Sequence, residues 1–278
     1  MGIHWLASYP KSGNTWVRAF LSAYKFGRLD INRLGFVSSD NQAHLFQLCC
    51  PVPHNEVSMY GWACVRAAML HALTHTDRSA QLILKTHNCA ASIGDMPVIP
   101  QALSEKSIYV IRDPRDVAVS YAHHLSVSMD EAISRMLANN AGVFPQAGKS
   151  FVMDVYSSWG MHVKSWTTRE FVQVIRYEDF LDTPEIHFRK VLDQYGIEYD
   201  QNQFENALAL STFDSLQKAE DEGGFNEKGK RQGRFFRRGK AGAWEDELSE
   251  QQVRKIESAF GDQMNYWGYP VEYAEQVA

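Results

Sequence analysis

The sequence predicts a single α/β domain with a central, mostly parallel β-sheet flanked by helices. The chain has 278 residues, 45% of them hydrophobic and 22% charged, which is enough apolar surface for a core and excludes a disordered or collagen-like chain. Four short runs are apolar on both faces, as in buried parallel strands: residues 3–8, 81–86, 107–111 and 171–175. Helical patterns lie between these runs without a linker or repeat, so we expect residues 1–278 to form one domain.

Five helices are expected between and after these strands. The segment Asp182-Thr183-Pro184-Glu185 indicates a helix start with a capping box and a proline in the first turn. The pair Ser249 and Gln252 indicates another. The predicted helices therefore cover residues 14–24, 117–124 and 155–167, one that begins at 182–185, and one that runs from 249 to about 260.

Residues 28–62 and 124–150 do not fit this alternation of strands and helices. The first segment places aromatic residues among turn-forming polar ones, and the second has a helical piece opened by Ser128-x-x-Glu131 and then a Gly/Pro stretch. Long insertions in a compact α/β domain are often lids or binding loops. The aromatic side chains could equally pack in the core, and the sequence leaves both interpretations open.

The charge of the chain narrows the class of partner. There are 28 Lys and Arg against 33 Asp and Glu, a net charge of −5, which argues against binding to a nucleic-acid polymer but permits a small anionic ligand. The N-terminus lacks a basic leader and no apolar run approaches the roughly 20 residues that span a bilayer. We therefore expect a cytoplasmic protein that binds no membrane.

Residues 9–16, with the sequence YPKSGNTW, predict an anion-binding loop directly after a strand. A strand, a loop with a central glycine and a helix together leave backbone N–H groups pointing at one spot, beside the positive end of the helix dipole. Lys11 adds a full charge, and hydroxyl groups follow. The loop is P-loop-like but is not a Walker A motif, because Gly13 follows Lys11 instead of preceding it. An ordinary capped helix start is the alternative interpretation.

A second candidate for anion binding lies at the end of the third apolar run. Arg112 comes where ligands of open α/β sheets bind. Ser120 is on the helix that follows, which could bring its hydroxyl group back toward the same anion. A solvated, salt-bridged turn is the alternative.

A third candidate is the basic stretch at residues 228–240, which holds seven positive residues and no acidic one. Arginine can bind a phosphate with two parallel hydrogen bonds, and glycine gives access to backbone N–H groups. Runs of charge are usually solvated surface. Flanking aromatic residues, Phe235, Phe236 and Trp244, favour a stretch that is anchored to the domain.

Lys85, Thr86 and His87 close the second predicted strand. A lone histidine is more often structural than catalytic. The position at the carboxyl end of a strand, beside Lys85, makes His87 a candidate catalytic residue.

Together these segments resemble the cytosolic-type sulfotransferase family, which transfers a sulfuryl group from 3′-phosphoadenosine 5′-phosphosulfate (PAPS) and releases 3′,5′-ADP (PAP). The resemblance covers most of the chain, in family order. The PKSGxTW loop of the family corresponds to residues 10–16, its KTH element to 85–87, its R-[ND]-P-x-D-x-x-x-S element to 112–120, its YED element to 177–179, its T-S-F element near the adenine to 211–213, and its RKGxxGxW element to 237–244.

The resemblance implies a role for each matching residue. His87 would be the general base, while Lys11 and Lys85 would stabilise charge on the leaving phosphate, and no metal is required. The donor-binding residues that it implies are Lys11, Ser12, Gly13, Asn14 and Thr15 at the 5′-phosphosulfate, Arg112, Ser120, Arg237, Arg238 and Gly239 at the 3′-phosphate, Trp16, Tyr177 and Phe213 around the adenine, and Ser211 and Thr212 beside Phe213.

The acceptor side departs from the family pattern, because Asn-Cys-Ala-Ala follows His87 where the family has Leu-Pro. The start of the chain looks closer to bacterial members, including those that sulfate glycopeptide antibiotics. The acceptor is expected to be a small-molecule alcohol, a phenol, or a peptide or sugar hydroxyl, and the aromatic residues of 28–62 favour a hydrophobic or aromatic alcohol. O- versus N-sulfation and oligomeric state stay open.

Two other functions compete with sulfuryl transfer. A P-loop kinase or nucleotidase would need a glycine before Lys11 and carboxylates for magnesium, neither of which the sequence offers. A catalytically inactive 3′,5′-ADP-binding protein is the second alternative, and the presence of both Lys11 and His87 argues against it.

Overall fold

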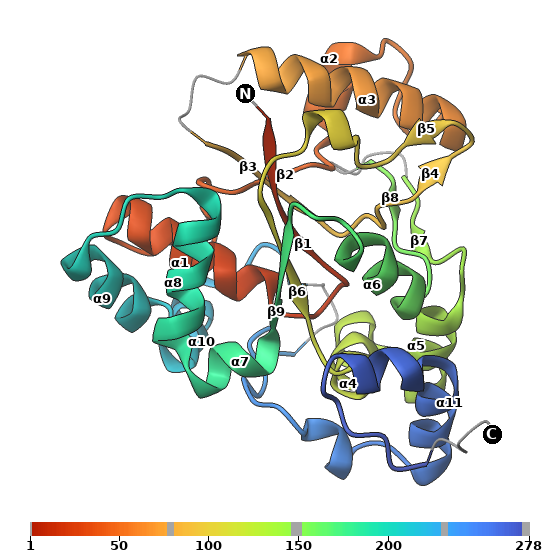
Figure 1. The fold of residues 1–278 in the computed structure, drawn as a ribbon, viewed down its shortest axis with the longest axis vertical. Coiled ribbons are helices and arrows are strands. Elements are labelled where there is room, and N and C mark those ends of the chain that lie inside the picture. The colour runs from red at the N-terminus through yellow and green to blue at the C-terminus, as the bar shows by residue number, and fades with distance from the viewer. Residues whose placement is uncertain (1, 77–80, 146–151, 229–232, 274–278) are drawn as a thin grey trace.

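The computed structural model has three layers, with helices on both faces of a central parallel sheet (Figure 1). It describes residues 2–76, 81–145, 152–228 and 233–273. Within these ranges the sheet has five strands in the order β2-β3-β1-β6-β9, every neighbouring pair parallel. The strands are β1 (Ile3–Ser8), β2 (Ser38–Ser39), β3 (Leu82–Thr86), β6 (Ser107–Ile111) and β9 (Val172–Arg176).

Four of the five strands were predicted, with ends that differ by at most one residue. The prediction missed β2, which is two serines long and carries no apolar run. Their pairing with Leu84 and Lys85 of β3 places β2 at the edge of the sheet. Two short antiparallel hairpins lie outside this sheet: β4 (Ser92–Ile93) with β5 (Met96–Pro97), and β7 (Gly142–Val143) with β8 (Asp154–Val155).

The helices of the described residues include all five that the sequence predicts. They are α1 (Asn14–Phe26), α2 (Ala43–Cys49), α3 (Met59–Thr76), α4 (Pro114–Leu125), α5 (Met129–Leu137), α6 (Trp159–Thr167), α7 (Tyr177–Asp182), α8 (Pro184–Tyr195), α9 (Gln201–Leu210), α10 (Phe213–Gly223) and α11 (Glu250–Tyr266). None of these helices is long and apolar enough to cross a membrane.

The start of each helix shows which local signals were interpreted correctly. Ser249 and Gln252 form the expected capping box of α11, and Ser128 caps α5. The capping box expected at 182–185 is wrong, because Thr183 precedes α8 without a side-chain hydrogen bond, although a proline does open the helix. The helix expected from residue 155 begins only at Trp159, because its first residue pairs in β8 instead.

Successive side chains of the central strands point to opposite faces of the sheet, and each face is covered by helices. On one side, Leu6 and Val110 pack against Phe20 of α1 and Phe188 of α8, whose ring centroids are 4.2 Å apart. On the other side, Trp5 of β1 belongs to a cluster with residues of α3, α4, α5, α6 and α11. Both faces are therefore covered, as the unbroken apolar strands predict. Figure 1 shows α1, α8 and α9 on one side and α4, α5, α6 and α11 on the other.

The two insertions are more regular than the sequence indicates. Residues 28–62 form β2, α2 and the start of α3, and their aromatic side chains Phe46 and Trp62 are buried in the core. Residues 124–150 form the end of α4, then α5 and β7, while 146–150 lie outside the described residues. Core packing, one of the two interpretations left open, holds for these two aromatic residues.

The strand order fixes where a ligand can bind. The chain runs from β1 outward to β2 and β3, and then crosses back to β6 on the other side of β1. The loop after β1 therefore lies between the ends of β3 and β6, at the switch point where open α/β sheets form their crevice.

Candidate functional site

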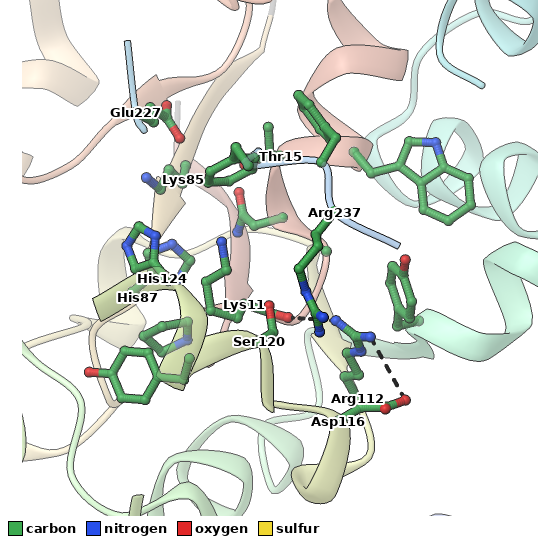
Figure 2. A pocket seen from close by; sticks show the side chains of 18 of the residues that line it. Lys11, Thr15, Lys85, His87, Arg112, Asp116, Ser120, His124, Glu227 and Arg237 are labelled. Atoms are coloured by element: carbon green, nitrogen blue, oxygen red, sulfur yellow. Dashed lines mark hydrogen bonds and ion pairs between the residues drawn. The ribbon is translucent and has the colours of Figure 1, made fainter. Parts of the chain in front are cut away.

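A cavity of about 620 Å³ opens at the carboxyl ends of the strands (Figure 2). Segments far apart in the sequence line it: the loop after β1, the ends of β3 and β6, the helix α4, the hairpin β7–β8, and the stretch from 235 to 243. The predicted residues that line it are Lys11, Gly13, Asn14, Thr15, Trp16, Lys85, His87, Arg112, Ser120, Tyr177, Phe213, Arg237, Arg238 and Gly239.

Three predicted donor-binding residues, Ser12, Ser211 and Thr212, do not line this cavity. The Ser211 hydroxyl donates to the Ala207 carbonyl at 2.7 Å, and Thr212 accepts from a backbone N–H as the N-cap of α10. The Ser211 carbonyl instead accepts a hydrogen bond from Trp16 Nε1 at 2.8 Å. Ser211 thus positions a cavity residue through its backbone.

The loop after β1 has an uncommon backbone conformation. Gly13 has a φ of 104°, and Lys11 has a φ of 69°, in the left-handed region that residues other than glycine rarely adopt. A Cβ on Gly13 would lie 2.6 Å from Tyr177 Cδ2. No side chain caps the N-terminus of α1. The first N–H groups of that helix are therefore available to an anion, as the sequence predicts.

Lys11 is the cation of this loop and lies in the centre of the cavity (Figure 2). Its Nζ is 3.8 Å from the centroid of the Phe235 ring. Burial, together with the positive charge of Arg112, lowers the pKa of Lys11 to about 7. An anion bound beside Lys11 would favour the charged form.

His87 follows β3 with its ring fixed in one orientation. Its Nδ1 donates to the Ser8 carbonyl at 2.8 Å, so Nε2 is the nitrogen left to act as a base. Burial and then the charge of Lys85 lower the pKa of His87 well below its ordinary value. The carbonyl of His87 is held in turn by His162 Nε2 at 3.1 Å. His87 is therefore a neutral, oriented imidazole.

Arg112 joins the first loop to the basic stretch. Its guanidinium donates to the carbonyls of Lys11 and Lys240, both at 3.2 Å, and lies 4.3 Å from the centroid of the Tyr177 ring. Its Nε is buried without a hydrogen-bond partner among the residues described. Figure 2 shows the ion pair between Arg112 and Asp116, 3.8 Å apart.

Asp116 anchors the chain directly after the basic stretch. Its carboxylate accepts from the backbone N–H groups of Gly242 at 2.9 Å and Trp244 at 3.1 Å. Trp244 is itself buried, so the described stretch is a fixed wall of the cavity. The cationic residues Lys230 and Arg231 lie outside the described residues.

Arg237 and Arg238 share one carboxylate, that of Glu247, each with a nitrogen 2.8 Å from Oε1. The same carboxylate group accepts from His123 Nε2 at 2.7 Å. His123 thus has a structural contact, whereas its neighbour His124 lines the cavity. Arg238 also lies 3.5 Å from Asp246 Oδ2, so two carboxylates accompany the two guanidinium groups.

The sequence interpretation missed several polar residues of the cavity: Ser39, Asn41, Gln42, Asp154, Tyr156 and Glu227. Burial would raise the pKa of Glu227, but Lys85 and Arg18 outweigh it and lower the pKa to about 2. Arg18 lies 2.6 Å from the carboxylate. These side chains belong to none of the motifs, and they come from three separate segments, at residues 39–42, 154–156 and 227.

The cavity has two ends of different chemistry. Figure 2 shows Arg112 and Arg237 at one end, Lys11 in the middle, and Lys85, His87 and Glu227 at the other. Nowhere in the described ranges do three or more His, Cys, Asp or Glu side chains gather in a way that could hold a metal ion. The expectation that catalysis needs no metal stays a prediction.

The comparisons with known proteins agree with the motifs. Residues 4–268 match the family described as Sulfotransferase domain. Flavonol 3-sulfotransferase of Flaveria bidentis is 24% identical over 289 residues, 95% of this chain and 82% of the relative. Sulfotransferase 1A1 of Rattus norvegicus is 26% identical over 222 residues, 76% of this chain and 65% of the relative. Cytosolic sulfotransferase 13 of Arabidopsis thaliana is 25% identical over 260 residues, 88% of this chain and 71% of the relative.

Solved structures confirm the fold. Mouse sulfotransferase SULT7A1 complexed with PAP has a TM-score of 0.61 at 17% identity, over 95% of this chain and 84% of that chain. Retinol dehydratase in complex with androsterone and PAP has a TM-score of 0.60 at 20% identity, over 94% of this chain and 80% of that chain. The expected likeness to bacterial members stays a prediction. The chain belongs to the sulfotransferase domain family, and the enzyme class that its motifs imply, a PAPS-dependent sulfotransferase, is confirmed.

Proposed function

We propose that the protein transfers a sulfuryl group from PAPS to a hydroxyl or amine group of a small-molecule acceptor, with His87 as the general base. One observation supports this most directly: a single cavity joins two sites with basic side chains, Lys11 and the Arg112–Arg237 wall, to a neutral histidine. PAPS carries two separate anionic groups, and these two sites match them in sign and number.

The residues of the cavity fit the donor. The arginines Arg112, Arg237 and Arg238, with Ser120 and the N–H of Gly239, would hold the 3′-phosphate. Arg112 Nε is buried and has no partner among the described residues, which leaves a donor for a phosphate oxygen. Aromatic faces suit a purine, and the aromatic side chains at hand are Trp16, Tyr177 and Phe213.

The 5′-phosphosulfate would bind at the loop after β1, where Lys11, Gly13, Asn14 and Thr15 line the cavity. The N-terminus of α1 adds its dipole to the charge of Lys11. These groups, with Lys85, would stabilise the negative charge that develops on the bridging oxygen as the phosphate leaves.

His87 would act on the acceptor. Its Nε2 takes the proton of the acceptor hydroxyl or amine group as that oxygen or nitrogen forms its bond to sulfur. The bond between sulfur and the phosphate oxygen breaks on the opposite side, and its electron pair leaves with PAP. The hydrogen bond from Nδ1 to Ser8 keeps Nε2 free for this step.

Donor competition tests the proposal against its alternatives. PAP should raise the melting temperature of the protein, because a ligand that binds only the folded state stabilises it, whereas ATP with magnesium should not. Stabilisation by ATP with magnesium alone would instead support a kinase. An assay with sulfur-labelled PAPS and a panel of acceptors then separates the enzyme from an inactive binding protein, which would bind PAP and transfer no label.

We further propose a cytoplasmic location, catalysis without a metal, and an acceptor that is a small alcohol, phenol, or peptide or sugar hydroxyl. The name of the Arabidopsis relative, a cytosolic sulfotransferase, supports the location, and the name of the Flaveria relative supports a small hydroxyl-bearing acceptor.

A further inference from the structure

The residues that the insertion 28–62 brings to the cavity are polar. They are Ser39, Asn41 and Gln42. Its largest buried aromatic side chains, Phe46 and Trp62, belong to the core instead. The reason for expecting a hydrophobic acceptor therefore does not hold at this wall.

Asp154 is the carboxylate of this polar wall. It comes from the hairpin strand β8, lines the cavity, and is 4% exposed. Each of its oxygens accepts one hydrogen bond from a side-chain amide: Oδ1 from Asn88 Nδ2 at 3.0 Å and Oδ2 from Asn41 Nδ2 at 2.7 Å. A carboxylate oxygen can accept about two hydrogen bonds, so each retains room for another donor.

No ion pair neutralises Asp154 within the part of the chain that is described. The nearby Arg66 is bound to Asp40, at 2.6 Å, with both side chains 1% exposed. Burial, and then the negative charge of Asp40, raise the pKa of Asp154 to about 7. The positive charges of Lys85 and Arg66 offset this effect in part. Without a direct ion pair, keeping a carboxylate at a cavity wall is still costly for the fold. A ligand that supplies a donor would offset this cost, which is a reason to expect one here.

Neighbouring residues link Asp154 to His87. Asn88, which holds Asp154, is the residue directly after His87. Tyr156, two residues beyond Asp154, places its ring edge-on to the His87 ring with centroids 6.5 Å apart. A small molecule with one group at His87 could therefore present a second group to Asp154.

We propose that Asp154 binds a second hydrogen-bond donor of the acceptor, an ammonium or hydroxyl group, and so selects a polar acceptor over an apolar one. This inference rests on the proposed function, since it places the reacting hydroxyl at His87. Asn41 and Asn88 are positioning residues for the carboxylate.

A matched series of phenols tests the proposal. The probes are 4-methylphenol, 4-(hydroxymethyl)phenol and 4-(aminomethyl)phenol, with the three analogues that have one more methylene. Within each spacer length only the terminal group changes, from methyl to hydroxyl to ammonium. The readout is kcat/KM with PAPS for each probe, and the variants are Asp154→Asn, Asp154→Ala and, as a control, the exposed Asp262→Asn.

The wild type should prefer the hydroxyl or the ammonium probe over the methyl probe at one spacer length or the other. Asp154→Asn and Asp154→Ala should lose about 10- to 100-fold of that preference, the usual effect of a hydrogen bond to a charged group, while Asp262→Asn keeps it. The preference is a ratio within one variant, so a loss of stability does not alter it. The polar probe that loses more of its preference in the Asp154 variants shows whether the natural donor is an ammonium or a hydroxyl group.

Equal losses for methyl and polar probes, or no preference in the wild type at either length, would overturn the role of Asp154. Calorimetry of the same probes with the PAP complex repeats the comparison without turnover. Polar probes that bind better to the wild type than to Asp154→Asn, with no labelled product, would support the inference and sink the proposed function instead.

Discussion

Gly239 lies so close to the ring of Phe213 that a Cβ on the glycine would be 2.1 Å from Phe213 Cδ2. The backbone of Gly239 also has a φ of 60°. These two residues come from the basic stretch and from the start of α10, and both line the cavity. Their contact couples the stretch that carries Arg237 and Arg238 to the start of α10.

Gly239→Ala should therefore weaken PAP binding by about 5- to 150-fold, because the methyl group displaces the Phe213 ring and overpacking costs about 1–3 kcal/mol. Calorimetry with PAP measures this loss. Gly196→Ala is the matched control, since Gly196 has a φ of 65° and open space around it. It should cost stability through backbone strain alone and leave PAP affinity within about twofold. Equal losses of affinity in both variants would contradict the coupling.

His87→Ala should lower kcat by about 10²–10⁴-fold, the usual contribution of a positioned base, and leave PAP affinity unchanged. Because burial holds the pKa of His87 well below its ordinary value, the base stays unprotonated at neutral pH. The kcat/KM of the wild type should therefore show no loss from this group between about pH 8 and 6.5. The exposed His44→Ala should behave as wild type. Wild-type turnover in His87→Ala would refute the assignment.

Lys11 should take up a proton when PAP binds above neutral pH. Its pKa of about 7 in the ligand-free protein means that the amine is largely neutral at pH 8, and the bound anion favours the ammonium. Calorimetry in buffers of different ionisation enthalpy should show uptake of up to about one proton at pH 8. PAP affinity should fall as the pH rises from 7 to 9.

The variant Lys11→Met tests whether Lys11 is the group that takes up the proton. It should abolish both the proton uptake and the decline in PAP affinity. The contribution of Lys11 to folding stability rises with pH, whereas its contribution to PAP affinity falls with pH. The folded state binds fewer protons than the unfolded state between about pH 7 and the ordinary lysine pKa, so Lys11 adds to stability as the pH rises through this range. A Lys11→Met variant that still takes up the proton would exclude Lys11 as the group.

Arg112→Ala should weaken PAP binding by about 10- to 100-fold, since hydrogen bonds to charged groups contribute about 1.5–3 kcal/mol. Arg112→Lys should recover only part of the affinity, because an ammonium keeps the charge but not the planar fork. Arg254→Ala, which breaks an exposed ion pair with Glu250 at 2.7 Å, should leave PAP affinity unchanged. Unchanged affinity in Arg112→Ala would remove this residue from the 3′-phosphate site.

The sequence by itself determined what depends on neighbouring residues. The apolar runs predicted β1, β3, β6 and β9, because a strand covered on both faces is apolar throughout. The loop around Lys11 and Gly13 was predicted because a strand, a glycine and a helix start follow one another directly. Strand ends meet at one edge of a parallel sheet, so His87 and Arg112 could be assigned to one site before any contact was known.

The tertiary structure alone decided what depends on distant segments. Ser211 and Thr212 turn their hydroxyl groups into helix contacts, which their motif does not reveal. Asp154 meets Asn41 and Asn88 across 113 and 66 residues of chain, and no local pattern encodes such a meeting. The sequence thus predicts the donor site, built from local loops at strand ends. The polar wall around Asp154 depends on long-range packing, which only the folded chain defines.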